Sequence, residues 1–293
     1  MAGELYMCAR VLVMYCALAA FLSAQEQVPA SRPGWPCVAG RAIDPAYVRT
    51  AEATGGQVFL FDRTEAGRSM VLMQNSGKHE DTIFRSTGVL STGSREFTFP
   101  VDSTIESLMV TVTLQCLQSI TVLRPTNTEV HAGEPDVNDN RFRSGQVLIL
   151  TKPQAGAWRV RIAGIGLFFV VAQAKSSISI GSVEFVELRG RLGHEGMFPV
   201  KGRICLGEQR TLSVNLNAPV GETHFRLIDS AGKTLEPLEM SAGEGGEGTF
   251  EGKLTLKHAA FRVAVEGRDA TGYPYQRVLP RLIQIQNPVP SAN

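Results

Sequence analysis

From about Thr82 to the end of the chain, β-branched and aromatic residues alternate with polar residues, and turn-forming residues separate the runs. A period of two is typical of strands that bury one face, because successive side chains of a strand point to opposite sides. The first set of runs comprises residues 82–88, 96–101, 107–114, 119–125, 146–152, 158–164, 167–174 and 182–188. Residues 163–166 supply two glycines and predict a tight hairpin between two of these runs. The pattern predicts a jelly-roll-like β-sandwich over residues 82–189.

A second set of alternating runs follows residues 189–197, a glycine-spaced segment that we interpret as a linker or sheet-crossing segment. These runs comprise residues 198–204, 210–216, 223–229, 248–256, 261–267 and 275–285. Turns rich in glycine, which supplies positive φ angles, lie between them at 229–233, 241–248 and 268–272. The length and the pattern predict an immunoglobulin-like sandwich over residues 190–286, followed by a flexible tail over residues 287–293.

Residues 43–81 have a different pattern, which predicts a short helix–strand–helix segment. Asp44 is a suitable N-cap, Pro45 fits the first helical turn, and glycines at 55 and 56 end the helix. The apolar run 57–61 then predicts a buried strand, and residues 63–77 predict a second helix. The predicted fold class is therefore mainly β: two β-sandwich domains, jelly-roll-like and then immunoglobulin-like, preceded by a short α/β segment.

The first residues have the three-part plan of a secretory signal, in which Arg10 precedes an apolar run over residues 11–22 and small residues follow. The run is short for a helix that crosses a bilayer, which needs ~20 apolar residues. We therefore predict cleavage after Ala24, and a retained anchor is the alternative. Residues 1–24 are then a signal peptide and residues 25–42 a Pro-rich leader. The mature chain is expected to be secreted or periplasmic, with no membrane span after signal removal.

Composition places the chain among folded proteins and argues against a nucleic-acid partner. Hydrophobic residues make up 43% and charged residues 19% of the chain, which is far from the composition of disordered segments. The net charge is +1 and no basic run is present, whereas nucleic-acid binding needs Lys and Arg gathered on one face.

Three of the five cysteines, Cys37, Cys116 and Cys205, lie after the predicted signal, in a compartment where disulfides persist. We predict a disulfide between Cys37 and Cys116, because it would fix the leader and because Cys205 lies in a separate predicted unit. Three free, partly buried thiols are the alternative. The spacing does not place two thiolates on one ion, so no cysteine-bound metal is expected.

The segment EPDVNDNRF, residues 134–142, concentrates oxygen-bearing side chains from Asp136, Asn138, Asp139 and Asn140. Calcium takes about six to eight oxygen ligands from carboxylates, carbonyls and water. These four residues are therefore the candidate calcium site. The alternative is a loop between two strands, in which the same side chains cap their own backbone.

The chain carries no sequence motif for catalysis or for a cofactor other than this calcium. A Gly-x-Ser-x-Gly elbow is absent, none of the five histidines stands in a His-Glu-x-x-His frame, and phosphate-binding glycine-rich loops are missing. A triad assembled from separate loops would leave no such motif. We predict that the protein is not an enzyme.

Four sequence segments resemble those of a known family: residues 53–62, 97–114, 152–164 and 272–278. In order and spacing they resemble the segment that follows the von Willebrand factor A domain in hemicentin-like extracellular proteins. The turn formed by Pro153 and Gly156 before Trp158 also resembles jelly-roll domains appended to secreted bacterial peptidases. The A domain's Asp-x-Ser-x-Ser ion site is not matched, because Glu106 stands at the last Ser position.

The resemblance implies extracellular scaffolding or adhesion through tandem β-domains, with no catalytic residue to carry over. We therefore expect a secreted, non-catalytic, adhesion-type protein whose sandwich surfaces bind an extracellular protein or a glycan. The alternative is an accessory carbohydrate-binding or hydrolytic module of an extracellular enzyme system, which needs a face lined by exposed Trp, Tyr and carboxylates. Two tryptophans, one of them in the leader, make such a face poor.

Overall fold

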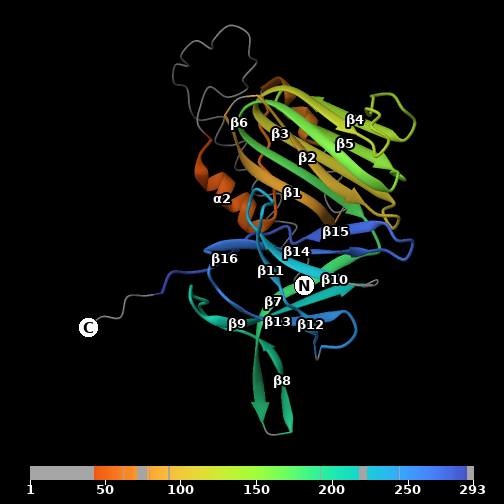
Figure 1. The fold of residues 1–293 in the computed structure, drawn as a ribbon. Coiled ribbons are helices and arrows are strands. Elements are labelled where there is room, and N and C mark those ends of the chain that lie inside the picture. Colours follow the sequence, from red (N-terminus) through yellow and green to blue (C-terminus); the bar gives the residue numbers. More distant parts are fainter. Residues whose placement is uncertain are drawn as a thin grey trace.

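The computed structural model describes residues 43–61, 63–70, 78, 80–91, 93–191, 193–217, 223–243 and 245–288. From Asp81 onward the alternating residues form strands. Over these ranges the helices are α2 (Pro45–Thr54) and a short 3-10 helix, η1 (Arg63–Arg68). No helix in the same ranges is long and apolar enough to cross a membrane. The strands form two stacked bodies (Figure 1), so the prediction of a mainly β fold with two sandwiches is confirmed.

The first sandwich is one sheet that bends back on itself. Its strands are β1 (Asp81–Leu90), β2 (Ser94–Val101), β3 (Ser107–Leu123), β4 (Val137–Phe142), β5 (Gly145–Thr151) and β6 (Gly156–Lys175). The long strands β3 and β6 pair along their whole length. β2 pairs with the first half of β6 and β1 with the second half. The smaller layer is therefore β2 with the adjoining halves of β6 and β3, and the larger layer contains β1, the other halves, β5 and β4.

The predicted hairpin at residues 163–166 is wrong, because β6 continues through it without reversing. Gly164 and Gly166 have φ angles of 151° and 103°, and the paired strand β3 shifts register between Leu114 and Cys116 at the same level. A Cβ atom at Gly164 would lie 2.2 Å from the carbonyl oxygen of Cys116. The glycines therefore allow a sharp bend in which two strands stay in close contact.

The core of the first sandwich lies between these two layers and includes Phe97, Phe99, Leu108, Val160 and Phe168. Trp158 lies in the same core at 1% exposure, and its Nε1 donates to the carbonyl oxygen of Gln154 at 2.8 Å. Trp158 thus fills the sandwich just after the turn at Gly156, whose φ angle is 136°.

Helix α2 and the segment after it cover the outer face of the larger layer. The helix is confirmed, with Asp44 Oδ1 accepting from the amide of Ala46 at 2.8 Å and Gly55 ending it at a φ angle of 76°. The strand predicted over 57–61 is wrong. Val58 and Leu60 are buried near Phe169 without forming a ladder, so side-chain packing on the sheet buries this run.

The second helix predicted over residues 63–77 is observed only as η1 and the helical residues 69 and 70. Residues 71–77 lie outside the described ranges. Gly67 occupies the interior of η1. Glycine disfavours a regular helix because ordering its backbone costs more entropy than for other residues.

The second sandwich packs two sheets around its own core. One sheet has the order β12-β13-β9-β7-β8, and the other has the order β11-β10-β14-β15, with β16 also paired to β14. The strands are β7 (Ser179–Arg191), β8 (His194–Pro199), β9 (Gln209–Asn217), β10 (Thr223–Ile228), β11 (Thr234–Leu238), β12 (Ser241–Ala242), β13 (Thr249–Thr255), β14 (Ala260–Arg268), β15 (Pro274–Val278) and β16 (Ile283–Gln284).

The strand over 182–188 belongs to the second sandwich, whereas the sequence pattern assigned it to the first. It forms part of β7, which pairs with β9 and β8, and Val183 and Phe185 pack in the second core. Residues 189–197 do not link domains, because they form most of the β7–β8 hairpin, which projects from the body (Figure 1). Alternation predicts a strand but not the sheet that the strand joins.

Candidate functional site

The two sandwiches meet through buried polar side chains, and this junction fixes how their exposed faces are oriented. Strand β1 of the first sandwich contacts β15 of the second. Arg85 of β1, Arg262 of β14 and Arg277 of β15 are each at most 1% exposed. Buried guanidinium groups need carboxylate and carbonyl partners, because removing a charge from water is costly.

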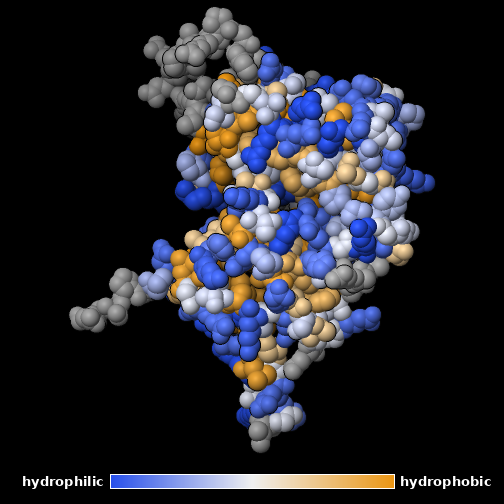
Figure 2. Space-filling model, in the orientation of Figure 1, coloured by the Kyte–Doolittle hydropathy of each residue, from blue (hydrophilic) through white to orange (hydrophobic). Residues whose placement is uncertain are grey.

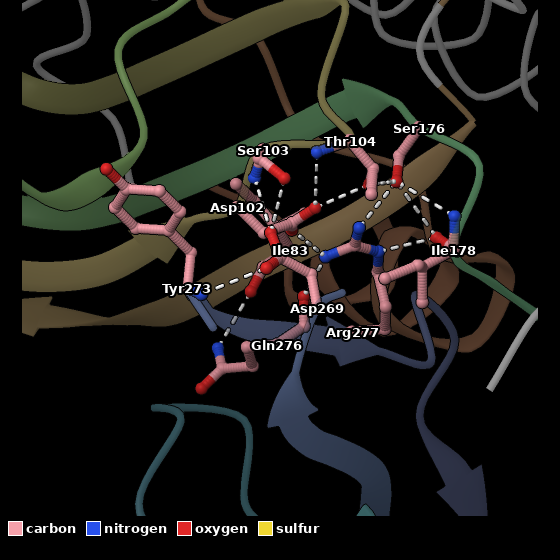
Figure 3. A network of polar contacts seen from close by, with 10 residues as sticks. All are labelled: Ile83, Asp102, Ser103, Thr104, Ser176, Ile178, Asp269, Tyr273, Gln276 and Arg277. Atoms are coloured by element: carbon pink, nitrogen blue, oxygen red, sulfur yellow. Dashed lines mark hydrogen bonds and ion pairs between the residues drawn. The ribbon is translucent and has the colours of Figure 1, made fainter. Parts of the chain in front are cut away.

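Arg277 lies at the centre of one polar network (Figure 3). Its Nη1 donates to Asp102 Oδ2 at 2.8 Å, and both side chains are at most 1% exposed. Its Nε donates to the carbonyl oxygen of Ile178 at 2.6 Å, and its Nη2 donates to Ser176 Oγ at 2.5 Å. The guanidinium of the second sandwich is thus held by the β2–β3 loop and by the segment that joins the sandwiches.

Asp269, in the loop between β14 and β15, joins the same network from the other side. Its Oδ2 accepts from the amide and the hydroxyl of Ser103 at 2.8 and 2.7 Å. Its Oδ1 accepts from the amides of Thr271 and Tyr273, both at 2.9 Å. Burial alone would raise the pKa of Asp269, but the hydrogen bonds from Ser103, Thr271 and Tyr273 outweigh it and lower the pKa to about 2. Asp269 therefore remains an ionised anchor across the junction.

Glu52 of α2 forms a second buried network. Its Oε1 accepts from Arg85 Nη2 at 2.8 Å and from Thr87 Oγ1 at 2.9 Å, and its Oε2 accepts from Arg262 Nη2. Burial acts to raise the pKa of Glu52, but the charges and hydrogen bonds of Arg85 and Arg262 lower it below its usual value. One carboxylate therefore connects α2, the first sandwich and the second sandwich.

Both networks orient the sandwiches relative to each other. Their charged groups pair with one another, and hydrogen-bonded ion pairs that are buried favour one geometry. These groups are therefore engaged within the junction, and the polar groups that can contact a ligand lie on the exposed faces.

The outer face of the smaller layer carries polar side chains, and hydrophilic atoms are prominent on the upper sandwich in Figure 2. We call Glu96, Thr98, Asn127, Arg159 and Arg161 the Glu96 face. Glu96 Oε2 accepts from Arg161 Nε and Nη2 at 3.1 and 2.8 Å, and Arg159 Nη2 donates to Asn127 Oδ1 at 2.5 Å. The hydrogen bond from Arg161 and the charges of both arginines lower the pKa of Glu96.

The Glu96 face is open to solvent, whereas α2 covers the outer face of the larger layer. The side chains of Arg159, Arg161 and Glu96 are 30, 53 and 33% exposed. Carboxylate, guanidinium and hydroxyl groups from β2 and β6, with the amide of Asn127 from the loop after β3, present donors and acceptors on this exposed face.

The predicted calcium residues lie mainly in an edge strand, so the loop interpretation is wrong for residues 137–142. β4 pairs with β5, and polar side chains are typical of an exposed edge, where they discourage further pairing. Asp139 accepts from Gln146 Nε2 at 2.7 Å and from Arg141 Nε at 2.9 Å. Asn140 Nδ2 donates to Asn138 Oδ1 at 2.8 Å.

Strand alternation separates the two asparagines from Asp139, and Asp136 is exposed before the strand. The structure therefore brings Asn138 and Asn140 together, but not the four side chains. Across the described ranges, no three or more His, Cys, Asp or Glu residues form a group that suits a metal ion. Calcium binding at this segment stays a prediction.

The cysteines are only partly described. Cys116 is disulfide-bonded, and Cys205 has a free thiol. Cys37 lies outside the described ranges, so its pairing with Cys116 stays a prediction.

Sequence reasoning missed the junction. Arg85, Arg262 and Arg277 are single cations inside otherwise apolar or alternating strands, and this is the signal that could have marked them. Their partners Glu52 and Asp102 lie at least 33 residues away in the sequence, so the ion pairs could not be inferred from spacing.

One comparison with known proteins matches the first sandwich. Residues 83–177 match the family model described as hemicentin galactose-binding domain-like. The match spans β1 to β6 and ends just before β7, which supports placing the boundary of the first sandwich there. It confirms the resemblance to hemicentin for this sandwich, and a position after a von Willebrand factor A domain stays a prediction. No curated protein matches the chain.

Three solved structures are similar at low identity. The lipase BlEst2 of Bacillus licheniformis, in propeptide form, is 14% identical with a TM-score of 0.30, and the match covers 69% of this chain and 41% of the lipase. The β-glucuronidase 3 of Bacteroides uniformis is 9% identical with a TM-score of 0.24, covering 68% and 28%. The titin immunoglobulin tandem A164-A165 is 12% identical with a TM-score of 0.20, covering 71% and 98%. The chain thus spans less than half the length of the first two proteins.

Proposed function

We propose that this chain is a non-catalytic binding module of the cell exterior that takes a glycan on its first sandwich. The second sandwich holds the first in a fixed orientation. The observation that carries the proposal is the match of residues 83–177 to a galactose-binding domain-like family. The matched sandwich has an uncovered polar face, and export before folding would bring that face to the cell exterior.

The Glu96 face has the groups that recognise sugar hydroxyls. A hydroxyl both donates and accepts, so it pairs with carboxylate oxygens and with guanidinium N–H groups. Glu96 supplies the acceptor, Arg159 and Arg161 supply donors, and Asn127 supplies both. Their mutual hydrogen bonds hold these side chains in place before a ligand arrives, which lowers the entropy lost on binding.

A glycan array with the purified full chain tests this proposal. We expect galactose-terminated glycans to bind and the double variant Arg159→Ala/Arg161→Ala to bind more weakly by about tenfold to a hundredfold, since a hydrogen bond to a charged group contributes about 1.5–3 kcal/mol. Arg189→Ala is the matched control, because Arg189 pairs with Glu187 on the projecting β7–β8 hairpin. Equal glycan binding by the folded double variant would reject the Glu96 face, and no glycan binding at all would reject the function.

A protein partner is the second candidate, and the β7–β8 hairpin favours it. Leu188 and Phe198 on this hairpin are 63 and 48% exposed. Exposed apolar side chains on a projecting ribbon are more typical of protein contacts than of sugar contacts. Protein binding that is lost in Leu188→Ser/Phe198→Ser and kept in the Arg159→Ala/Arg161→Ala variant would favour this candidate.

The proposal also states that the chain is exported and that it is not a catalyst. Each of these statements has its own test. An esterase, protease and glycosidase screen of the full chain should show no turnover. Activity that a single serine or carboxylate substitution abolishes would favour a hydrolytic module. Export predicts that the mature chain begins at Gln25, which N-terminal mass spectrometry of protein from a secreting host measures.

A further inference from the structure

The three sheet orders end in β1, β4, β11, β15, β12 and β8, and an open edge pairs with further strands unless something blocks it. β1 and β15 lie against each other at the junction. β4 carries consecutive polar and charged residues, β11 contains Pro237, and β12 has 2 residues. All of these features block strand edges in natural sheets. β8 differs, because its central residues 196–198 carry no charge and its proline, Pro199, is its last residue.

The open edge of β8 presents backbone groups of Glu195 and Met197. In an antiparallel pair, residues that hydrogen-bond to the neighbouring strand alternate with residues that do not. The amide of Val200 donates to the carbonyl oxygen of Phe185 at 2.8 Å, so Pro199 is of the second kind, which suits its missing N–H. Met197 and Glu195, two and four residues earlier, are of the same kind. Their N–H and C=O groups therefore point away from β7.

We propose that β8 is a contact between two copies of this chain, which pair antiparallel about a two-fold axis at Met197. In this register the two Met197 residues exchange a pair of backbone hydrogen bonds, and each Glu195 amide donates to the carbonyl oxygen of Pro199 in the second copy. Each hairpin projects from its own body (Figure 1), so antiparallel pairing places the two bodies at opposite ends of the joined hairpins. The contact does not depend on which ligand the Glu96 face takes.

The apolar side chains of the hairpin match in this register. Leu188 is paired with Met197, so both side chains lie on one face of the hairpin. Leu188 is 63% exposed although it is apolar. Pairing of two copies places Leu188, Met197 and the same two residues of the second copy in one row across four strands. Apolar cross-strand neighbours stabilise a sheet, so the contact gives partners to side chains that a single copy leaves in water.

The opposite face of the hairpin also matches its own copy. Glu187 is paired with Phe198, and Arg189 is paired with Gly196. The register aligns Phe198 of one copy with Gly196 of the other, so an aromatic ring lies over a glycine. Each of these rows then ends in Glu187 on one side and Arg189 on the other. Residues 186–199 contain two Glu and two Arg, so the hairpins of two copies do not repel each other through net charge.

Sedimentation equilibrium of the full chain between about 10 µM and 1 mM tests the contact, because an interface of one strand per copy is small and weak. The weight-average mass should rise toward that of a dimer. Met197→Lys and Met197→Glu should each stay monomeric, because like charges would lie directly opposite each other. An equimolar mixture of the two variants should dimerise, since Lys and Glu then lie opposite each other.

Met197→Pro tests the backbone pairing separately. The N–H of Met197 points away from β7, so a proline keeps the β7–β8 hairpin, removes the exchanged hydrogen bonds and should give a monomer. Val89→Ser is the matched control, because Val89 is an apolar residue of β1 that is 70% exposed, and this variant should dimerise like the wild type.

A wild-type chain that stays monomeric at the highest concentration would overturn the inference and assign the edge to a different partner. Dimers of Met197→Lys alone, of Met197→Glu alone or of Met197→Pro would also overturn it, as would a mixture of the two charged variants that stays monomeric. If the charged variants do not fold, Met197→Pro and the wild type decide the outcome.

Discussion

Replacing Glu52 by glutamine should destabilise the chain strongly, although Glu52 lies outside both sandwiches. The change keeps the shape of the side chain and removes its charge. Arg85 and Arg262, at 1 and 0% exposure, would then lose the carboxylate that neutralises them. Leaving a buried charge without its partner costs about 3–5 kcal/mol, and here two cations share the loss. We therefore expect the free energy of unfolding to fall by at least about 3 kcal/mol.

Urea unfolding of the full chain, followed by circular dichroism, measures this loss. Glu106→Gln is the matched control, because Glu106 pairs with Lys175 on the surface, where the side chains are 67 and 63% exposed. An exposed pair contributes about 0–1 kcal/mol, so this control should unfold near the wild-type midpoint. If both variants lose the same small amount of unfolding free energy, the buried Glu52 network does not stabilise the junction.

The remaining predictions concern the junction and the bend of the first sandwich. Asp102→Asn should lower the free energy of unfolding by about 3–5 kcal/mol, because Arg277 would stay buried with a neutral partner. Thermal unfolding measures this loss of stability, and a variant that melts at the wild-type temperature would contradict the prediction. Acid should destabilise the chain as the pH falls through about 2: the folded pKa of Asp269 is depressed from 3.8, so its stabilisation is complete above pH 4 and lost below its folded pKa. A pH series of urea midpoints for the wild type and Asp269→Asn tests this, and identical acid limbs would refute it. Gly164→Ala should yield little folded protein, because its Cβ would lie 2.2 Å from the carbonyl oxygen of Cys116; a variant as soluble and stable as the wild type would show that the bend tolerates a side chain.

The sequence predicts local structure well where a periodic pattern or a cap determines it. The helix from Pro45 to Thr54 follows from Asp44 and Gly55, and most strands follow from alternation. The sequence does not determine which strands pair or where a strand reverses direction. Glycines at 164 and 166 suit both a hairpin and a bend, and only close pairing of β6 with β3 selects the bend.

Less of the candidate site than of the fold could be predicted from the sequence. The oxygen-bearing side chains of residues 136–140 suggest ligands for a calcium ion. Residues 137–140 instead form part of the edge strand β4, which pairs with β5, and their side chains hydrogen-bond to neighbouring residues. The Glu96 face arises because β2 and β6 become neighbours, which the sequence does not specify. The ion pairs of the junction join residues that lie 33 residues apart for Glu52 with Arg85, 175 for Asp102 with Arg277 and 210 for Glu52 with Arg262.

The central claim is that the first sandwich takes a glycan on its Glu96 face. NMR titration of the isotope-labelled full chain with a galactose-terminated oligosaccharide tests it most directly. We expect saturable shifts confined to residues on β2, on the first half of β6 and around Asn127. The Arg159→Ala/Arg161→Ala variant should need about tenfold to a hundredfold more ligand for the same shifts. Saturable shifts that cluster elsewhere, or no shifts at millimolar ligand, would contradict it.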